Sequence, residues 1–369
     1  MNIDKDYEKN ITIDCRMFDA AGIGTYLKNV LPEIIQDSPN YSFTLLINKS
    51  DSNNSFFPNF PNASPLIVNA PIYSIREQFE LLNKIPPTTH LFWSPHFNIP
   101  IFYRGKLLVT IHDVYHMAFF NKLNLPQKLY TKLFFSKIRT KAELIICDSN
   151  FTKGELLKYQ EINPDRIHTI HLGVDPFWFD TQAQTQLTEK PYFLFVGNIK
   201  PHKNLKTLLK AFERIMDRIP HNLILIGKDS GFITEDKEVK LIAKSLGDRI
   251  IFKGKVNNNE LRRFYQNAEA FIFPSLYEGF GLPAIEAMAS RCPVLASHAG
   301  SLPEICGDAA IYFNPLEPSD IADKIMDFVK NNSVKGRLIE QGLNVAKNFT
   351  WQEAGRRTLN SIKLLLGNN

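Results

Sequence analysis

The stretch AFIFPSLYEGFGLPAIEAMA, residues 270–289, combines a strand, a glycine loop and the start of a helix. Ala270–Phe273 is a short apolar run and predicts a buried parallel strand. Gly279 and Gly281 follow it, and Pro283 suits the first turn of a helix, where its missing N–H loses no partner. This order directs backbone N–H groups and the positive end of a helix dipole toward whatever lies above the sheet, which predicts an anion site.

Two glutamates flank the glycine loop, Glu278 before it and Glu286 in the helix after it. Because a carboxylate repels a phosphate, we expect the pair to bind neutral hydroxyl groups at the two ends of an anionic ligand. A sugar nucleotide has such an anionic middle and hydroxyl-rich ends. By themselves, two glutamates at this spacing would indicate only surface residues. The strand and the glycines around them favour a ligand site instead.

This stretch resembles the donor-site signature of the family 4 retaining glycosyltransferases. The resemblance rests on Glu278 and Glu286 with seven residues between them, on Gly279-Phe280-Gly281, and on the preceding Pro274-Ser275. It implies an α/β chain with the GT-B fold, in which two Rossmann-like domains face each other across a cleft. It also implies that Glu278 holds the transferred hexose and that Glu286 accepts hydrogen bonds from ribose hydroxyls. The donor-binding residues that it implies in this stretch are Gly279, Phe280, Gly281, Leu282 and Glu286.

Length and composition fit this interpretation. A chain of 369 residues exceeds the usual size of one core, so we expect two domains. The net charge of +5 is too small for a nucleic-acid binder without a dense basic patch. The four cysteines are widely spaced and form no zinc pattern, which favours reduced thiols. The N-terminus has no apolar segment of a signal peptide, and no apolar run is long enough to span a membrane, so we expect a cytoplasmic protein.

The sequence pattern of the first half of the chain predicts alternating strands and helices, which favour a parallel sheet. A Gly22-Ile23-Gly24 turn opens a helix that we expect to run through Val30, and the resemblance makes Gly22 and Gly24 candidates for the donor site. His112-Asp113 ends one strand, and by itself such a pair would indicate a local hydrogen bond. Members of the family carry a cleft histidine at this position, so the resemblance implies that His112 forms a hydrogen bond with the transferred sugar. The strands expected in this half cover residues 11–13, 43–47, 66–68, 91–93, 107–111 and 144–147.

The domains are expected to change over near His171–Asp175. The resemblance then implies an acceptor domain at 1–175, a donor domain at 176–351, and a terminal helix at 352–369 that packs back on the first domain. In the second domain, a strand at 192–196 leads into Gly197 and then Lys203, and the resemblance implies that both bind the donor. Asn204 is the expected N-cap of the next helix.

Lys203 is the expected cation for the donor diphosphate. Asn198 and His202 stand where many family members carry an arginine, so one bidentate phosphate contact is missing here. Lys200 or His202 is a candidate second cation.

The catalytic residues implied are therefore His112, Lys203 and Glu278, with no metal and no cofactor. The expected substrates are a nucleotide-diphosphate sugar and a hydroxyl of a glycan or lipid-linked acceptor in surface polysaccharide synthesis. GDP-mannose is favoured because Trp93–Pro100 and His112-Asp113 resemble bacterial polysaccharide mannosyltransferases, and UDP-sugars stay open.

Three alternatives remain. A sugar-nucleotide epimerase shares the GT-B fold, but the first half suggests no catalytic acid pair. A dehydrogenase would need a third glycine after Gly22 and Gly24. A non-catalytic sugar-nucleotide-binding module would not need the diphosphate lysine.

Residues 122–141 form a basic stretch without an acidic residue. The spacing of Leu129 with Leu133, and of Lys128 with Lys132, predicts an amphipathic helix. It is either a solvated helix over an apolar core or a helix that contacts an anionic membrane surface.

Overall fold

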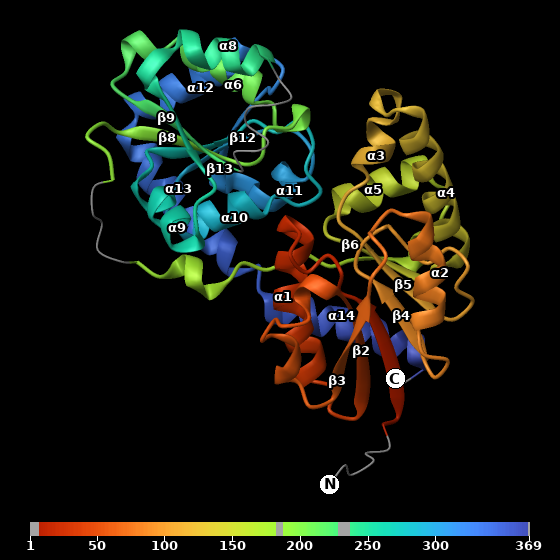
Figure 1. The fold of residues 1–369 in the computed structure, drawn as a ribbon. Helices are drawn as coiled ribbons and strands as arrows, with labels where there is room; N and C mark the ends of the chain where they lie inside the picture. The colour runs from red at the N-terminus through yellow and green to blue at the C-terminus, as the bar shows by residue number, and fades with distance from the viewer. Residues whose placement is uncertain (1–6, 182–186, 228–236, 368–369) are drawn as a thin grey trace. The chain divides into compact units, whose positions relative to one another are not determined.

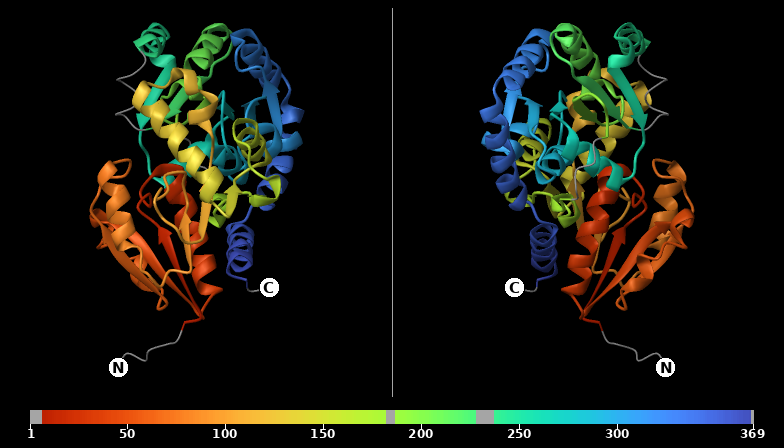
Figure 2. Two further views of the ribbon diagram at one scale, coloured as in Figure 1. Left: turned by 90° about the vertical axis from the view of Figure 1, so that its right-hand side faces the viewer. Right: turned by 90° about the vertical axis from the view of Figure 1, so that its left-hand side faces the viewer.

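The computed structural model describes residues 7–181, 187–227 and 237–367. The chain forms two compact units, Met1–Gly173 with Trp351–Asn369, and Val174–Thr350. The family resemblance places the corresponding boundaries at 175 and 352. Both units are α/β, with helices packed on a parallel sheet (Figures 1 and 2).

The first unit contains a seven-stranded parallel sheet in the order β3-β2-β1-β4-β5-β6-β7. Its last strand, β7, was not expected, because its three residues, Ile-His-Thr, form no apolar run. Strands β4, β5 and β6 are buried along their whole length and, apart from Ser94 and Thr110, are apolar, as is typical of strands covered on both faces. The strands are β1 Lys9–Asp14, β2 Tyr41–Asn48, β3 Ala63–Val68, β4 Leu91–Ser94, β5 Leu107–Ile111, β6 Leu144–Cys147 and β7 Ile167–Thr169.

Helix α1 runs from Ala21 to Gln36 and not only to Val30, so it continues through Pro32. The buried face of the helix explains the extension. Ile34 and Ile35 belong to this face, and their side chains are buried only because the helix continues past Val30. The other helices of this unit are α2 Ile75–Lys84, α3 Tyr115–Ala118, α4 Leu125–Lys141, α5 Asn150–Tyr159 and α14 Trp351–Leu366, with short 3-10 turns η1 Lys49–Asp51, η2 Phe57–Asn59, η3 Phe120–Lys122 and η4 Pro164–Arg166.

The C-terminal helix α14 returns to the first unit and packs against α1 (Figure 1). A Cβ at Gly355 would lie 2.4 Å from Cβ of Glu33, so the missing side chain allows the two helices to approach closely. Trp351 is buried at the start of α14, and its ring centroid lies 6.4 Å from that of Tyr26 on α1.

The second unit contains a six-stranded parallel sheet in the order β10-β9-β8-β11-β12-β13. The strand at Ala270–Phe273 is β11, and it lies inside the sheet between β8 and β12. The remaining strands are β8 Tyr192–Val196, β9 Asn222–Ile226, β10 Ile250–Gly254, β12 Val294–Ser297 and β13 Ala310–Phe313.

Helix α6 supplies part of the core of this unit through Leu208, Leu209 and Phe212, which pack with buried strand residues. The helices here are α6 Leu205–Glu213, α8 Lys237–Ser245, α9 Asn258–Asn267, α10 Leu282–Ala289, α11 Leu302–Cys306, α12 Pro318–Lys330 and α13 Asn332–Lys347, with 3-10 turns η5 Pro176–Phe179, η6 Pro201–Lys203, η7 Met216–Arg218, η8 Gly247–Arg249 and η9 Gly307–Ala309.

Each sheet reverses its strand order once, between β1 and β4 in the first unit and between β8 and β11 in the second. In open α/β sheets, ligands bind beyond the carboxyl ends of the strands at such a reversal. The loop after β11 therefore lies at the expected ligand position of its own sheet.

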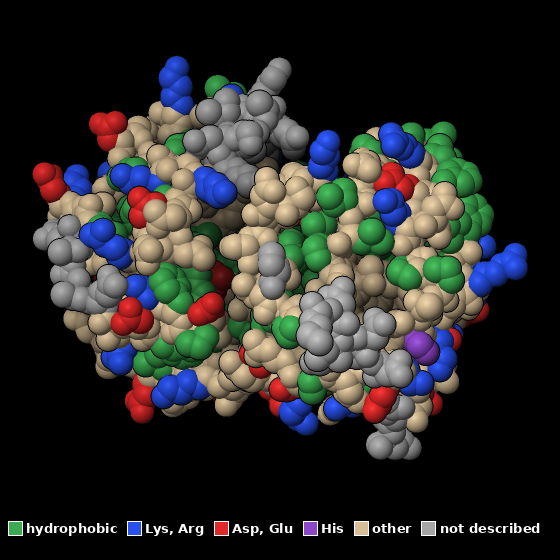
Figure 3. Space-filling view, turned by 60° about the horizontal axis from the view of Figure 1, so that its bottom comes forward, with side chains coloured by type: hydrophobic (Ala, Val, Ile, Leu, Met, Phe, Trp, Pro, Cys, Tyr) green, Lys and Arg blue, Asp and Glu red, His purple; other side chains and the backbone are tan. Residues whose placement is uncertain are grey.

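The surface charge is mixed on the face shown in Figure 3, where lysine and arginine side chains alternate with acidic and hydrophobic ones. That face lacks the dense basic stripe typical of nucleic-acid binding. Among the residues described, no helix is both long and apolar enough to cross a bilayer.

Candidate active site

The loop between β11 and α10 ends in a glycine that no other residue could replace without strain. Gly281 is the N-cap of α10 and has φ 107°, a conformation that L side chains rarely adopt. A Cβ there would also approach Cδ2 of Leu302 to 2.8 Å. Among the described residues, no side-chain hydrogen bond caps this helix, and its first turn has no acidic residue. The N–H groups near Leu282 thus suit an anionic ligand, as the sequence predicts.

The turn after β12 holds this loop in place. Ser301 Oγ donates to the carbonyl of Phe280 at 2.7 Å, and the Ser301 N–H donates to the carbonyl of Glu278 at 3.2 Å. Phe280 itself is buried, with its ring centroid 5.6 Å from that of Phe349. The loop carrying Glu278 and Gly279 is therefore preorganised by contacts that the sequence did not reveal, since a serine in a turn has no distinctive pattern.

Lys203 and Glu278 lie together, although 75 residues separate them. Nζ of Lys203 donates to Oε1 of Glu278 at 2.6 Å, and the side chains are 17% and 13% exposed. The ammonium also lies 5.5 Å from the ring centroid of Phe273, the last residue of β11. Lys203 ends η6, in the loop that follows β8 and begins at Gly197, where a Cβ would lie 3.7 Å from Cδ of Lys203. The strand-order reversal thus brings a cation and a carboxylate to the same place.

Asn204 does not cap α6 with its side chain, contrary to the sequence-based expectation. It adopts a left-handed conformation with φ 57° and makes no capping hydrogen bond. Its amide instead donates to the carbonyls of Pro274 at 3.0 Å and Pro315 at 2.7 Å. Asn204 therefore joins the lysine loop to the loops after β11 and β13, which fixes the backbone next to Lys203.

Glu286 lies on α10 with a half-buried side chain. In the part of the chain that the structure describes, no hydrogen bond or ion pair involves its carboxylate. Burial alone raises the pKa of Glu286 to about 7. A carboxyl group in this setting gains from hydroxyl groups that donate to it, as those of a ribose do.

His112 is held at both ring nitrogens beyond the carboxyl end of β5. Nδ1 lies 2.6 Å from Oδ2 of Asp148, and Nε2 lies 2.9 Å from the carbonyl oxygen of Pro95. Burial lowers the pKa of His112, but the Asp148 carboxylate and the Pro95 carbonyl raise it by a larger amount. The pKa of His112 is therefore above its ordinary value. Two acceptors around one imidazole favour the ring with both nitrogens protonated.

Asp113 is not the partner of His112. Its Oδ1 accepts from the N–H of Tyr115 at 2.9 Å, which is the local turn that an isolated His-Asp pair would suggest. The acidic partner, Asp148, comes from the end of the neighbouring strand β6. Sequence spacing could not identify it, since the two residues are 36 positions apart.

The two glycines of α1 differ in their surroundings. A Cβ at Gly24 would lie 2.2 Å from the carbonyl oxygen of Phe18, so the chain before the helix requires glycine at this position. A Cβ at Gly22 would meet no atom within 4 Å, which leaves room for a ligand. The same helix carries Tyr26, whose ring centroid lies 5.0 Å from that of His112.

A buried charged network at the strand-order reversal of the first sheet escaped the sequence analysis. Nη2 of Arg16 lies 2.6 Å from Asp14 and 2.5 Å from Glu77, and Nδ2 of Asn98 donates to Glu77 at 2.7 Å. Burial raises the pKa of Asp14, but Arg16 and His96 lower it more, so its pKa lies well below the ordinary range. No local motif marks these residues, because the contacts join β1, α2 and the loop after β4.

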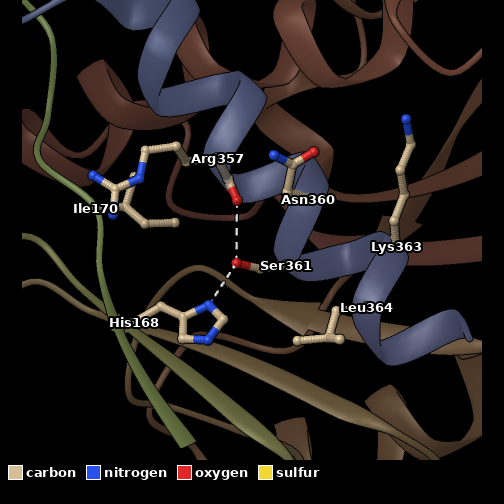
Figure 4. A pocket seen from close by; sticks show the side chains of 7 residues that line it. All are labelled: His168, Ile170, Arg357, Asn360, Ser361, Lys363 and Leu364. Carbon is tan, nitrogen blue, oxygen red and sulfur yellow. Dashed lines mark hydrogen bonds between the residues drawn. The ribbon is translucent and has the colours of Figure 1, made fainter. Parts of the chain in front are cut away.

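A cavity of about 450 Å³ lies between β7 and α14 and contains none of the predicted site residues (Figure 4). Within it, Nδ1 of His168 lies 3.0 Å from Oγ of Ser361, which donates to the carbonyl of Arg357 at 3.1 Å. Burial lowers the pKa of His168, and nearby cations lower it further. These contacts attach the returning helix to the edge of the sheet, so we interpret the cavity as part of that packing.

Two family models match the chain. "Glycosyl transferases group 1" matches residues 177–345, and "Glycosyltransferase Family 4" matches residues 50–177. Among similar proteins, O-antigen chain mannosyltransferase B of Escherichia coli is 28% identical over 337 residues, which cover 86% of each chain. O-antigen chain mannosyltransferase RfbU of Salmonella typhimurium is 28% identical over 220 residues, 60% of this chain and 59% of the relative.

Solved structures share the fold over almost the whole chain. Sucrose-phosphate synthase from Thermosynechococcus elongatus has a TM-score of 0.78 at 19% identity and covers 98% of this chain and 100% of its own. Anabaena HepE in complex with UDP-glucose has a TM-score of 0.78 at 15% identity, covering 96% of this chain and 99% of its own. With both halves matched in sequence and both sheets matched in structure, the chain belongs to the family 4 glycosyltransferases and is an enzyme with the GT-B fold.

Proposed function

We propose that this enzyme transfers mannose from a nucleotide-diphosphate sugar to a hydroxyl group of a surface glycan, with retention of the anomeric configuration. The observation that carries the proposal is the Lys203–Glu278 pair beside the uncapped N-terminus of α10. One place in the second sheet thus offers a cation and backbone N–H groups for a diphosphate, together with a carboxylate for sugar hydroxyls.

The proposed chemistry is a substitution at the anomeric carbon. The bond from this carbon to the phosphate oxygen breaks, and its electron pair goes to the diphosphate. The acceptor oxygen bonds to the same carbon from the face that the diphosphate leaves, and its proton passes to the leaving phosphate oxygen. Lys203 and the N–H groups of Gly279, Phe280 and Gly281 stabilise the charge that develops, which is usually the largest catalytic contribution.

Glu278 and Glu286 bind the two ends of the donor in this proposal. Glu278 accepts from hydroxyls of the transferred hexose, and Glu286 accepts from the ribose. We keep His112 as the group that meets the transferred sugar; since Nδ1 faces Asp148 and Nε2 faces the Pro95 carbonyl, an N–H reaches a sugar hydroxyl only when Nε2 leaves that carbonyl. No step is assigned to a metal or a cofactor.

GDP-mannose is the donor that we favour, because two of the relatives are named as O-antigen mannosyltransferases. A UDP-sugar is the alternative, because HepE is described in complex with UDP-glucose. A thermal-shift screen of GDP, UDP, GDP-mannose and UDP-glucose separates the two. We expect the guanine ligands to raise the melting temperature more than the uracil ligands; the reverse order would reject GDP-mannose.

The acceptor is proposed to be lipid-linked and to be reached from the cytoplasmic side of a membrane. Helix α4 supports this, because Leu125, Leu129 and Leu133 are 69%, 61% and 43% exposed. The core side of the helix is formed instead by other residues, including Phe134 and Ile138, so the leucines do not cover the core as amphipathic spacing would suggest. Exposed leucines between lysines suit an anionic lipid surface.

A further inference from the structure

A second cavity, of about 420 Å³, lies in the first unit between helix α4 and the segment that precedes α2. We call it the aromatic cavity. It is lined by Tyr73, Phe97, His116, Pro126, Gln127, Tyr130 and Thr131.

Aromatic rings form its walls. The rings of Tyr73 and Phe97 are stacked at an interplanar angle of 27°, with centroids 6.2 Å apart. The Tyr130 ring meets Tyr73 edge-on at 5.8 Å and 80°. The Phe135 ring also stacks with that of Phe97, with centroids 5.6 Å apart and an interplanar angle of 17°. The cavity thus has fixed, flat apolar walls.

Tyr73 holds its position at a conformational cost. Its φ is 69°, and such a value in a bulky residue is a genuine outlier. Its N–H donates to Oε2 of the buried Glu77 at 2.7 Å, which maintains this conformation, while the side chain remains 50% exposed. Strain of this kind is concentrated at ligand sites, where the surrounding structure imposes it.

The buried network of the first sheet fixes a second wall. The Tyr130 hydroxyl donates to Oδ1 of Asn98, and Asn98 donates to Glu77, which Arg16 neutralises. Both tyrosines therefore depend on the same carboxylate. The buried network therefore holds both rings in place, and preorganised walls reduce the entropy lost on binding.

The lining indicates the class of ligand. None of its seven residues is a lysine, an arginine or an acid, so it does not suit a phosphate. His116, Gln127 and Thr131 add polar groups that an aliphatic chain would leave unused. A sugar ring presents a C–H face to an aromatic wall and hydroxyls to polar groups at its edge, and so matches both features.

The cavity lies next to His112. Phe97 follows two residues after Pro95, whose carbonyl contacts Nε2 of His112 at 2.9 Å, and His116 follows His112 by four residues. We propose that the aromatic cavity is a subsite for a hexose ring of the acceptor glycan. This assignment to the acceptor rests on the function proposed above.

Octyl α-mannopyranoside tests the subsite, because it carries a sugar ring and an alkyl chain in one molecule. Saturation-transfer NMR with the full chain should show transfer to protons on one face of the ring. Tyr73→Gly removes the ring at a φ that glycine adopts freely, and it should weaken the Kd by about tenfold, or about 1.4 kcal/mol, as expected for an aromatic contact. Phe79→Ala, an exposed aromatic residue of α2 outside the cavity, should leave the Kd unchanged.

The proposal would be overturned if the NMR saturation reached only protons of the alkyl chain. It would also be overturned if the ring protons were saturated equally with Tyr73→Gly and with wild type. A second variant, Gln127→Ala, should also weaken binding; because Oε1 of Gln127 accepts from the N–H of Asn124 at the start of α4, its melting temperature is measured alongside. In kinetics, Tyr73→Gly should raise KM for the mannoside and leave the rate of donor hydrolysis without acceptor unchanged. An equal fall in the rates of transfer and of hydrolysis would reject an acceptor subsite. A wild-type enzyme that turns over no donor would count against the proposed function, while the NMR still reports on the cavity.

Discussion

Lys203 is held by Glu278 in the structure and would bind the donor diphosphate during turnover. The two side chains are only 17% and 13% exposed, so the ammonium leaves Glu278 only when another anion takes the place of the carboxylate, as the diphosphate would. The diphosphate brings more negative charge than Glu278 and also meets the N–H groups of α10. The pair therefore places Lys203 correctly without locking it.

The proposed contact of Glu286 with the ribose predicts that nucleotide affinity depends on pH. Its folded pKa of about 7 means that its carboxyl is largely protonated below that pH and cannot accept from both ribose hydroxyls. Because the ribose hydroxyls bind the ionised form of Glu286 better, nucleotide affinity should increase as pH rises from 5 to 8. We expect Glu286→Gln to reduce this rise, as measured by titration calorimetry with the nucleotide at several pH values. A wild-type curve that matches the variant would reject the ribose assignment.

Truncation tests the same residue at one pH. Glu286→Ala should weaken nucleotide binding by about 1–3 kcal/mol and affect kcat less, because the lost hydrogen bonds belong to binding. Unchanged affinity for the free nucleotide would contradict it.

His112 is expected to stabilise the fold most at low pH. Its folded pKa is raised, so the cation contributes stability that is fully present below the unfolded pKa of about 6.5 and is lost as pH rises through the folded pKa. Urea unfolding of wild type and His112→Gln at pH 6 and pH 9 measures this. The wild-type advantage should be larger at pH 6; a larger advantage at pH 9 would show that the neutral ring is the form held by Asp148.

At the scale of elements, the sequence predicted what local patterns determine. The strand at Ala270–Phe273 and the helix after Gly281 follow from an apolar run, glycine and proline, which act within a few residues. The strand β7 was missed because His168 and Thr169 interrupt any apolar run.

Contacts between distant elements were beyond sequence reasoning. The Asp148 partner of His112, the Asn204 bonds to two loops and the Arg16–Glu77 pair each depend on which strands become neighbours in the sheet. Lys203 and Glu278 were assigned to one ligand by the family resemblance, and their direct contact appears only in the structure.

Packing of α14 on α1 depends on Gly355. We expect Gly355→Ala to destabilise the chain by about 1–3 kcal/mol, because the added methyl would overlap Glu33 at 2.4 Å. Gly336→Ala in α13 is the matched control: a Cβ there meets no atom, and alanine should stabilise the helix by up to about 1 kcal/mol. Urea denaturation separates the two, and equal effects would show that α14 adjusts its position.

For the molecule as a whole, the exposed leucines and lysines of α4 predict reversible binding to anionic membranes. Each lysine near such a surface contributes about 1 kcal/mol, and the attraction weakens with salt. Liposome flotation should recover the protein on anionic vesicles at low salt and less at high salt. Leu129→Ser should reduce recovery, whereas Leu241→Ser, an exposed leucine of the second unit, should not. Equal recovery on neutral and anionic vesicles would contradict membrane contact through this helix.

The proposed mechanism requires Lys203 to bind the diphosphate of a nucleotide sugar during hexose transfer. Release of nucleoside diphosphate from GDP-mannose and UDP-glucose, with octyl α-mannopyranoside as acceptor, tests it most directly. Lys203→Ala should lower the rate at least a hundredfold, or about 2.7 kcal/mol, while Lys206→Ala on α6 removes the same charge from an exposed position and should leave it nearly unchanged. A Lys203→Ala enzyme that stays within about tenfold of wild type would contradict the account, because the diphosphate charge would then be balanced elsewhere.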